Sequence, residues 1–374
     1  MSRQKIIFPL QLEQALTEAI SKCQPDRIFV LVDETTQRLC LPVVAHFGCM
    51  KDVQPIVINA GDLHKDLEAV VHVWSELQRM GATRHSLLLN LGGGMVTDLG
   101  GFAASTFKRG ISMVNIPTTL LSMVDASVGG KTGINFGGLK NEIGVFRNAS
   151  TVILDTVFLK TMDMENILSG YAEMLKHGLI NQFSSPSEKS MIDELLAFDI
   201  EHPDLTELKR MVADSVEVKQ RIVLEDPTEK GIRKALNLGH TVGHAFESLA
   251  LASTLPQVEG HLQGKNPPPS ALKPVLHGYA VAWGLVCELY LSVMKAGFPV
   301  DKMRQTVRFI FDHYGRMPIT CDDTPTLLEL MTHDKKNVAG QINFTLLGDI
   351  GDIRINQTAT KTEIEEALDF YREG

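Results

Sequence analysis

"SLLLNLGGGMVTDLGGFAAS" (residues 86–105) joins a short apolar run to three consecutive glycines, Gly92 to Gly94. The run 86–90 is typical of a buried strand, and the glycines stand where that strand would hand over to a helix. Glycine lets the backbone approach a ligand, and a helix N-terminus offers free N–H groups and a partial positive charge. The turn therefore suits a pyrophosphate. Because it lacks the G-x-G-x-x-G fingerprint of dinucleotide-binding folds, a purely structural turn is an equal alternative.

The segments around this turn alternate between strand-like and helix-like patterns. One helical pattern, 62–80, repeats apolar residues at helical spacing. Alternation of this kind predicts a parallel, doubly wound sheet. We expect its strands at residues 27–33, 55–59, 86–90, 112–117 and 151–155.

The hydrophobic pattern changes from about Met162 onward, where long helical patterns replace the strand-like runs. A β-rich stretch (340–355) and an amphipathic helix close the chain, and the Pro-, Gly- and Ser-rich segment 253–274 reads as a loop. The sequence thus predicts an α/β Rossmann-like domain over residues 1–160 and a mainly helical domain over 161–374.

Composition excludes several classes of protein. The net charge of −9 argues against binding to nucleic acid or an anionic membrane, and no apolar run reaches the roughly 20 residues that span a bilayer. The N-terminus lacks the pattern of a secretory signal. Five scattered cysteines without a C-x-x-C motif indicate free thiols in a reducing compartment. We therefore expect a cytoplasmic protein.

Two histidines, His240 and His244, stand four residues apart in "LNLGHTVGHAFE" (236–247). On a helix they would lie on one face, so both rings could reach one bound object. That object could be a metal ion, or a metal ion together with its substrate. Two ordinary half-buried histidines are the alternative.

A longer stretch, "IPTTLLSMVDASVGGKTGINFGGLKNEIGVF" (116–146), follows the glycine turn and its Asp98. With "GYAEMLKHGLI" (170–180), "RKALNLGHTVGHAFE" (233–247) and "HGYAVAWG" (277–284), it resembles the 3-dehydroquinate synthase family of sugar-phosphate cyclases. The resemblance extends from about residue 27 to 350, with the motifs in the order of the family.

This resemblance implies a metal site made by Glu173, His240 and His277. Two imidazoles and a carboxylate with an open fourth position are the usual ligands of catalytic zinc, and Co²⁺ suits the same set. His244 would then reach the substrate rather than the metal. His261, in the loop, is a rival ligand on chemistry alone.

The resemblance also implies an anionic sugar-phosphate substrate, 3-deoxy-D-arabino-heptulosonate 7-phosphate. Cationic side chains inside the motifs of this acidic chain suit its carboxylate and phosphate. One or both of Lys335 and Lys336 would join the pocket, whose other members are Asp125, Lys131, Asn141, Lys176, Lys219, Arg233, Asn237 and His244.

The implied cofactor is NAD⁺, bound by the first domain. Asp33, at the end of a predicted strand, could hold the ribose or could instead cap the following helix. The family usually has Gly-Glu where this chain has "AGDLHKD", so the carboxylate of Asp62 is one methylene shorter. The positions that match the family's NAD⁺ contacts are Asp33, Asp62, Lys65, Gly93, Gly94, Asp98, Thr118, Thr119, Lys140 and Thr161.

The implied reaction yields 3-dehydroquinate and phosphate, a step of the shikimate pathway to aromatic amino acids, with NAD⁺ regenerated in each turnover. A homodimer is the expected assembly. Three alternatives stay open: another cyclase of the aminodehydroquinate, 2-deoxy-scyllo-inosose or valiolone type, a glycerol-dehydrogenase-like polyol dehydrogenase, and an inactive NAD-binding protein. Asn237 and His244 together favour dehydroquinate synthase over the valiolone type.

Overall fold

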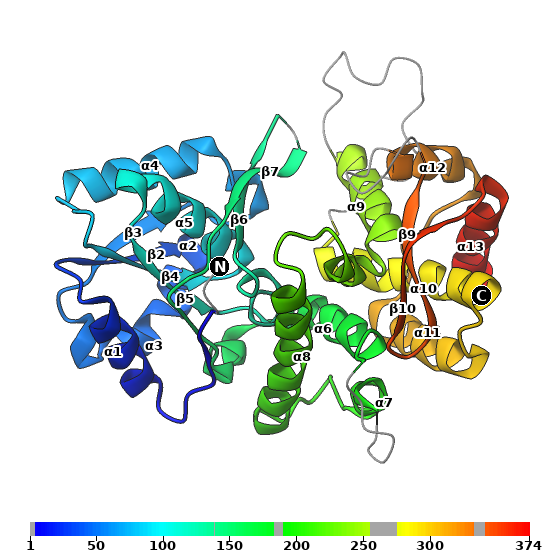
Figure 1. Ribbon diagram of the computed structural model, residues 1–374, viewed down its shortest axis with the longest axis horizontal. Helices are drawn as coiled ribbons and strands as arrows, with labels where there is room; N and C mark the ends of the chain where they lie inside the picture. The colour runs from blue at the N-terminus through cyan, green and yellow to red at the C-terminus, as the bar shows by residue number, and fades with distance from the viewer. Residues whose placement is uncertain (1–3, 138, 183–189, 255–274, 333–340) are drawn as a thin grey trace. The chain divides into compact units, whose positions relative to one another are not determined.

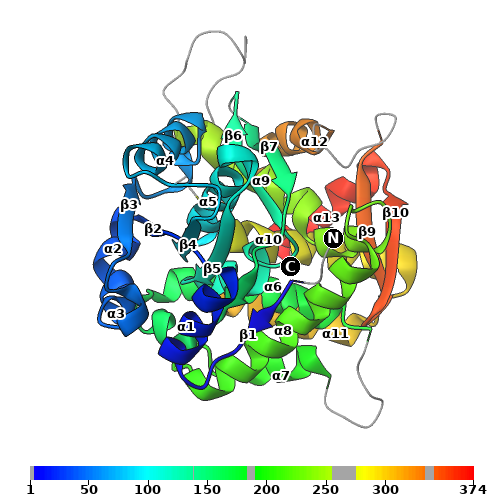
Figure 2. The same ribbon diagram turned by 60° about the vertical axis from the view of Figure 1, so that its left-hand side comes forward.

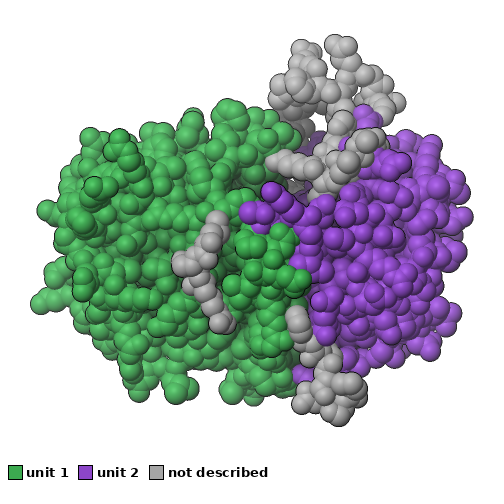
Figure 3. All heavy atoms as spheres, in the orientation of Figure 1, with its two compact units in different colours: residues 1–170, 203–227 green, residues 171–202, 228–374 purple. Residues whose placement is uncertain are grey.

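The computed structural model describes residues 4–137, 139–182, 190–254, 275–332 and 341–374. They form two compact units, residues 1–170 with 203–227 and residues 171–202 with 228–374 (Figure 3). Three sequence predictions fall outside the described residues: Lys335 and Lys336, His261, and nearly all of the loop 253–274. Each unit has its own architecture.

The first unit contains a six-stranded, wholly parallel sheet in the order β1-β8-β5-β4-β2-β3. Its strands β2 to β5 are labelled in Figures 1 and 2. The predicted α/β class is confirmed, and all five predicted strands are present. The two-residue β1 was not predicted. The strands are β1 (Ile6–Ile7), β2 (Ile28–Asp33), β3 (Gln54–Ile58), β4 (Leu87–Gly92), β5 (Ser112–Pro117) and β8 (Thr151–Ile153).

The helices of this unit include α5 (Gly94–Thr106), which packs on β4 and β5, and α8 (Leu205–Glu225), which comes from later in the chain. A β-hairpin of β6 (Lys131–Phe136) and β7 (Leu139–Phe146), not predicted from the sequence, packs against α5 through β6. The remaining helices are α1 (Leu12–Cys23), α2 (Glu34–Leu39), α3 (Leu41–Ala45) and α4 (Leu67–Arg79), together with the first residues of α6 (Met164–Leu179).

Strand order marks one edge of the sheet as the place for a ligand. The chain runs outward from β2 to β3 and returns to β4 on the other side of β2, so the connections diverge between β2 and β4. In open parallel sheets, ligands bind at such a point, outside the carboxyl ends of the strands. Asp33 ends β2, and Gly92, the first of the three glycines, ends β4, which puts both at the carboxyl ends of the strands.

The second unit is mainly helical, as predicted, with one β-hairpin. Helix α10 (His277–Ala296) lies at its centre and contacts α9, α11, α13 and β9. The other elements are α7 (Met191–Ala197), α9 (His240–Thr254), α11 (Val300–Tyr314), α12 (Thr324–Thr332), β9 (Asn343–Asp349), β10 (Asp352–Thr358) and α13 (Lys361–Glu373).

Helix α10 is, among the described residues, the one helix long and apolar enough to cross a membrane by length and composition. However, 67% of that apolar window is buried inside the protein, which is typical of the core helix of a soluble protein. All five cysteines are free thiols, as predicted.

Glycines allow α9 and α10 to approach closely. A Cβ on Gly284 of α10 would lie 1.9 Å from the carbonyl oxygen of Gly239 and 2.7 Å from the backbone nitrogen of Gly243. Gly239 itself has a φ of +80°, which side chains other than glycine rarely adopt. The glycines that weaken a helix in isolation are therefore required by the packing of two helices.

We expect Gly284→Ala to lower the free energy of unfolding by about 1–3 kcal/mol or more, because backbone atoms cannot rotate away from the added methyl group. Denaturant unfolding of the metal-free protein would measure the change. Gly48→Ala is the control, since a Cβ there meets nothing nearer than 3.9 Å. An equal effect of the two substitutions would contradict the packing argument.

Candidate active site

The glycine turn connects β4 to α5, as predicted. Helix α5 begins at Gly94. Its N-cap residue, Gly93, has no side chain to accept hydrogen bonds from the first N–H groups of the helix, and the first turn contains no acidic residue. A Cβ on Gly93 would lie 3.2 Å from Thr119 Cγ2, and the backbone N–H of Thr118 donates to Gly92 O at 3.0 Å. This uncapped, side-chain-free helix N-terminus fits a phosphate group.

Asp33 caps α2, the local role that was the alternative in its prediction. Its Oδ1 accepts a hydrogen bond from the backbone N–H of Thr36 at 2.7 Å, and the Thr36 hydroxyl accepts from the Asp33 N–H at 3.0 Å. The carboxylate is held in one orientation at the sheet edge. Ribose binding by Asp33 stays a prediction.

A buried lysine joins several predicted cofactor and substrate residues in the first unit. Lys65 Nζ lies 2.6 Å from Asp98 Oδ2 and 2.6 Å from Asn141 Oδ1, and Lys140 Nζ lies 3.4 Å from Asp62 Oδ2. Burial raises the pKa of the Asp98 carboxyl, and the ion pair with Lys65 opposes that shift. Both Lys140 and Asn141 lie on the hairpin strand β7.

We expect Lys65→Met to weaken NAD⁺ binding at least about 10-fold. The variant loses the charged hydrogen bond from Lys65 to Asp98, itself a predicted cofactor residue, and leaves that carboxylate uncompensated. Such a bond is worth about 1.5–3 kcal/mol. Isothermal titration with NAD⁺ would measure the affinity. Lys51→Met, at an exposed lysine of the same unit, is the matched control. Equal affinity in the two variants would remove Lys65 from the cofactor site.

Thr161 is the predicted cofactor residue farthest along the first unit. It ends the 3₁₀ helix Thr156–Thr161, is exposed, and donates its hydroxyl to Phe158 O at 3.1 Å. Its contact with NAD⁺ stays a prediction.

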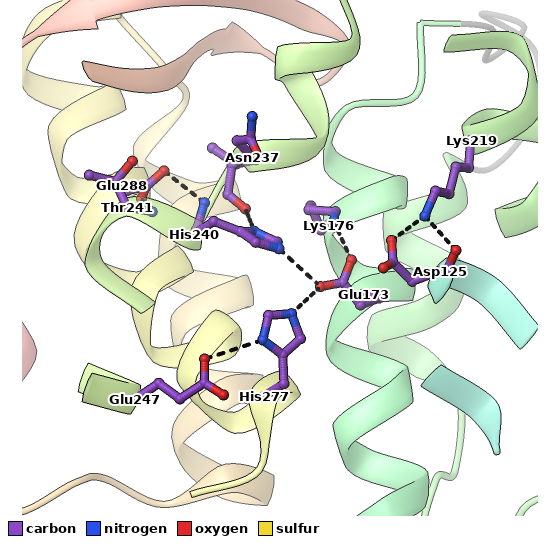
Figure 4. Close-up of polar contacts among 12 residues, drawn as sticks. Asp125, Glu173, Lys176, Lys219, Asn237, His240, Thr241, Glu247, His277 and Glu288 are labelled. Carbon is purple, nitrogen blue, oxygen red and sulfur yellow. Dashed lines mark hydrogen bonds and ion pairs between the residues drawn. The ribbon is translucent and has the colours of Figure 1, made fainter. Parts of the chain in front are cut away.

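The three predicted metal ligands come from three helices of the second unit. Glu173 lies on α6, while His240 and His277 are the first residues of α9 and α10. One ligand atom of each residue lies within 4.8 Å of the other two. Both imidazole Nε2 atoms lie 3.6 Å from Glu173 Oε1, and Figure 4 shows the two rings pointing at that carboxylate.

The geometry of this trio fits a divalent cation. A separation of 3.6 Å is too long for a hydrogen bond, but it suits two ligands that each bind one ion at about 2.0–2.2 Å. Glu173 Oε1 is fully buried, and among the described residues no hydrogen-bond donor meets it. An orphaned buried carboxylate oxygen facing two imidazoles is the donor set expected at a zinc site.

The charge of Glu173 is balanced within the helix. Lys176, also buried, donates to Glu173 Oε2 one turn further along α6. Burial alone would raise the pKa of Glu173, but Lys176, followed by His277 and His177, holds it well below its usual range. Burial alone would lower the pKa of His277, yet the carboxylates of Glu173 and Glu247 raise it to about 10.

A fully buried carboxylate that was not predicted supports the start of α9. Glu288, on α10, accepts hydrogen bonds from the backbone N–H groups of Gly239 at 2.7 Å, Thr241 at 3.0 Å and Val242 at 3.3 Å. It thereby supplies the N-terminal cap that α9 lacks in its own sequence. The signal in the sequence was one glutamate inside the otherwise apolar run of α10.

The predicted substrate residues are divided between the two units. In the first unit, Lys219 Nζ on α8 lies 2.5 Å from Asp125 Oδ1 and 2.6 Å from Asp125 O, while Lys131 is exposed at the start of β6. Asn141 belongs to the Lys65 cluster described above. Three of these residues precede residue 150 and the fourth, Lys219, follows residue 200.

The second unit holds the other four predicted substrate residues. Lys176 donates a hydrogen bond to Glu173, and the side chain of Arg233 is buried, with 2% of the residue exposed. Asn237 Nδ2 donates to Glu229 Oε1 at 3.0 Å. The His244 ring lies 5.3 Å from that of His240 and 6.1 Å from that of His277, measured between centroids. The i,i+4 pair thus lies on one face of α9, as expected.

Comparisons with known proteins agree with this architecture. The family model of the 3-dehydroquinate synthase N-terminal region matches residues 55–169, and that of the C-terminal region matches residues 170–337. The 3-dehydroquinate synthase of Parabacteroides distasonis is 49% identical over 374 residues, covering 100% of this chain and 99% of the relative.

Two solved structures share the fold. A 2-deoxy-scyllo-inosose synthase complexed with carbaglucose-6-phosphate, NAD⁺ and Co²⁺ has a TM-score of 0.80 at 23% identity, covering 99% of this chain and 96% of that one. A 2-epi-5-epi-valiolone synthase from Streptomyces hygroscopicus with NAD⁺ and Zn²⁺ bound has a TM-score of 0.79 at 24% identity, covering 100% and 98%. The family models span most of the chain and the relative matches its full length, so the chain belongs to the 3-dehydroquinate synthase family of enzymes.

Proposed function

We propose that this chain converts 3-deoxy-D-arabino-heptulosonate 7-phosphate to 3-dehydroquinate and inorganic phosphate, using catalytic NAD⁺ and a divalent metal ion. The observation that carries the proposal is the trio of Glu173, His240 and His277, which has the donor set and spacing of a catalytic metal site. Membership of the family and the names of the relatives supply the reaction.

The cofactors divide between the units. NAD⁺ would be held in the first unit by the glycine turn and by the Lys65 cluster, and the metal would be held in the second unit by the trio. Bound NAD⁺ supplies a reversible hydride acceptor, and bound Zn²⁺ or Co²⁺ supplies a Lewis acid for the hydroxyls of the substrate. Zn²⁺ is our first choice because two imidazoles and a carboxylate with an open position suit it.

The side chains of the protein bind and orient the polyanion. Arg233 has a rigid, planar fork of donors that matches a carboxylate or phosphate, and Lys131, Lys176 and Lys219 contribute charge. Lys219 is oriented by Asp125, and Lys176 by Glu173. Holding the substrate at several points favours elimination and ring closure in one geometry.

His244 is the candidate for moving a proton at a substrate hydroxyl. It stands one helical turn from His240 on the same face of α9, yet it is not a member of the metal-ligand trio. An imidazole titrates near neutral pH, which suits a group that takes and returns a proton.

A panel of three sugar phosphates tests the substrate. Purified protein loaded with Zn²⁺ or Co²⁺ and supplied with NAD⁺ would be given the heptulosonate 7-phosphate, glucose 6-phosphate or sedoheptulose 7-phosphate, and phosphate release would be followed. We expect turnover of the heptulosonate alone. Turnover of another sugar phosphate in its place would reassign the chain to a different cyclase.

Two further proposals accompany the function. We propose a homodimer, the commonest symmetric assembly of soluble enzymes, and a cytoplasmic location, in agreement with five free cysteines. Analytical ultracentrifugation of the purified protein tests the first, and fractionation of cells tests the second.

A further inference from the structure

Helix α9 carries a third polar residue on the face that holds the two histidines. His240, His244 and Glu247 occupy positions i, i+4 and i+7, which fall on one side of an α-helix. Glu247 is neither a member of the Glu173 trio nor a residue singled out from the sequence. Its carboxylate nevertheless faces that trio from the same unit.

The two nitrogens of the His277 ring face two different carboxylates. Nε2 lies 3.6 Å from Glu173 Oε1, whereas Nδ1 lies 3.5 Å from Glu247 Oε2, and Figure 4 shows the ring between them. The side chains of His277 and Glu247 are 29% and 12% exposed. A mostly buried carboxylate therefore stands behind the ring, on the side away from Glu173.

A neutral imidazole has one N–H and one nitrogen with a free lone pair, and a metal ion binds only the latter. In the neutral ring, a carboxylate next to Nδ1 favours the tautomer with the proton on Nδ1 and the lone pair on Nε2. It also increases the basicity of the ring and restricts its rotation. We propose that Glu247 is a positioning residue that prepares His277 Nε2 to bind the metal, an inference that rests on the proposed metal centre.

The second imidazole of the centre is supported differently. His240 Nδ1 meets the backbone carbonyl of Leu238 at 3.1 Å, an acceptor that no substitution removes. His277 instead has the charged carboxylate of Glu247 beside its Nδ1, at an ion-pair distance of 3.5 Å. Glu247 is thus a side-chain support of His277 that mutagenesis can remove without altering any of the three ligands.

The test is a titration of metal-free protein with Co²⁺, followed by visible absorption. It compares wild type with Glu247→Gln and Glu247→Ala. Glu363→Gln is the matched control, because Glu363 caps α13 and pairs with Lys295 at 2.5 Å in the same unit but belongs to a different helix. Thermal unfolding of each metal-free variant is measured alongside.

We expect Glu247→Ala to weaken Co²⁺ binding about 10–100-fold, the range seen when such outer carboxylates are lost. Glu247→Gln, which keeps an acceptor oxygen, should recover part of the affinity, and Glu363→Gln should bind as wild type. The absorption bands of the bound ion should stay close to those of wild type, because the three ligands are unchanged.

Three results would overturn the proposal. Equal Co²⁺ affinity in wild type and Glu247→Ala, with only a lower Tm of the metal-free variant, would make Glu247 a residue of the fold alone. Two Co²⁺ per chain in wild type and one in Glu247→Gln would make Glu247 a ligand of a second ion, shared with His244 and His277. If wild type bound no Co²⁺, the proposed metal centre itself would be wrong. In the first two results the metal centre stands and only the role of Glu247 fails.

Discussion

Removal of the metal is expected to lower kcat by at least about 1,000-fold. Lewis-acid stabilisation of developing charge is worth several kcal/mol, and each 1.36 kcal/mol is a factor of ten in rate. Protein dialysed against a chelator would be assayed for phosphate release, and Zn²⁺ or Co²⁺ would then be added back. Wild type should recover its activity.

Glu173→Gln gives the same result by another route. The variant loses the carboxylate that faces both imidazoles, so added metal should not restore its activity. Chelated wild type needs no mutation, which keeps the test valid even if loss of the partner of Lys176 destabilises the variant. Full activity of wild type shown by mass spectrometry to be metal-free would refute the metal centre.

The second large effect is expected at His244. His244→Ala should lower kcat about 100- to 10,000-fold, the usual contribution of a general acid or base, while the metal content stays at the wild-type level. The reason is its position beside His240 but outside the Glu173 trio. Steady-state kinetics and elemental analysis of the same preparation measure both quantities.

A control histidine separates this role from a general loss of structure. His202→Ala removes an exposed imidazole of the same unit, paired with Asp199 at 3.4 Å, and should change neither kcat nor metal content. If His244→Ala lost metal but kept its activity per bound ion, His244 would be a ligand and the assignment of the trio would be wrong.

Most of the parallel sheet was predictable because its strands are short apolar runs bounded by turn residues. The strand predicted at 112–117 is the observed Ser112–Pro117. The β6–β7 hairpin was missed, because its sequence is rich in glycine and every residue of β7 is exposed. Such strands are specified by pairing with each other rather than by an apolar pattern.

The packing of residues 203–227 could not be predicted from the order of segments in the chain. Residues 203–227 pack with the first unit, so Lys219 meets Asp125 across 94 positions of sequence. A helical pattern indicates a helix but not the unit in which it packs. The pair could be anticipated only from the resemblance to a family.

The candidate site was predictable to the extent that it depends on local spacing. The four-residue interval predicts that His240 and His244 share a face, and they do. Glu247 and Glu288 were not singled out, because their roles arise from the packing of α9 on α10 rather than from either helix alone. A glutamate at i+7 of the histidine pair, and one inside an apolar helix, are the signals that remained in the sequence.

The measurement that tests the central claim most directly uses far less NAD⁺ than substrate. Metal-loaded protein would receive excess heptulosonate 7-phosphate, while phosphate, the carbocyclic product and absorbance at 340 nm are followed together. The proposed function predicts many equivalents of phosphate and 3-dehydroquinate per NAD⁺, rising in step, with no net NADH. NADH that accumulates in proportion to turnover, or turnover that stops when NAD⁺ is exhausted, would contradict it.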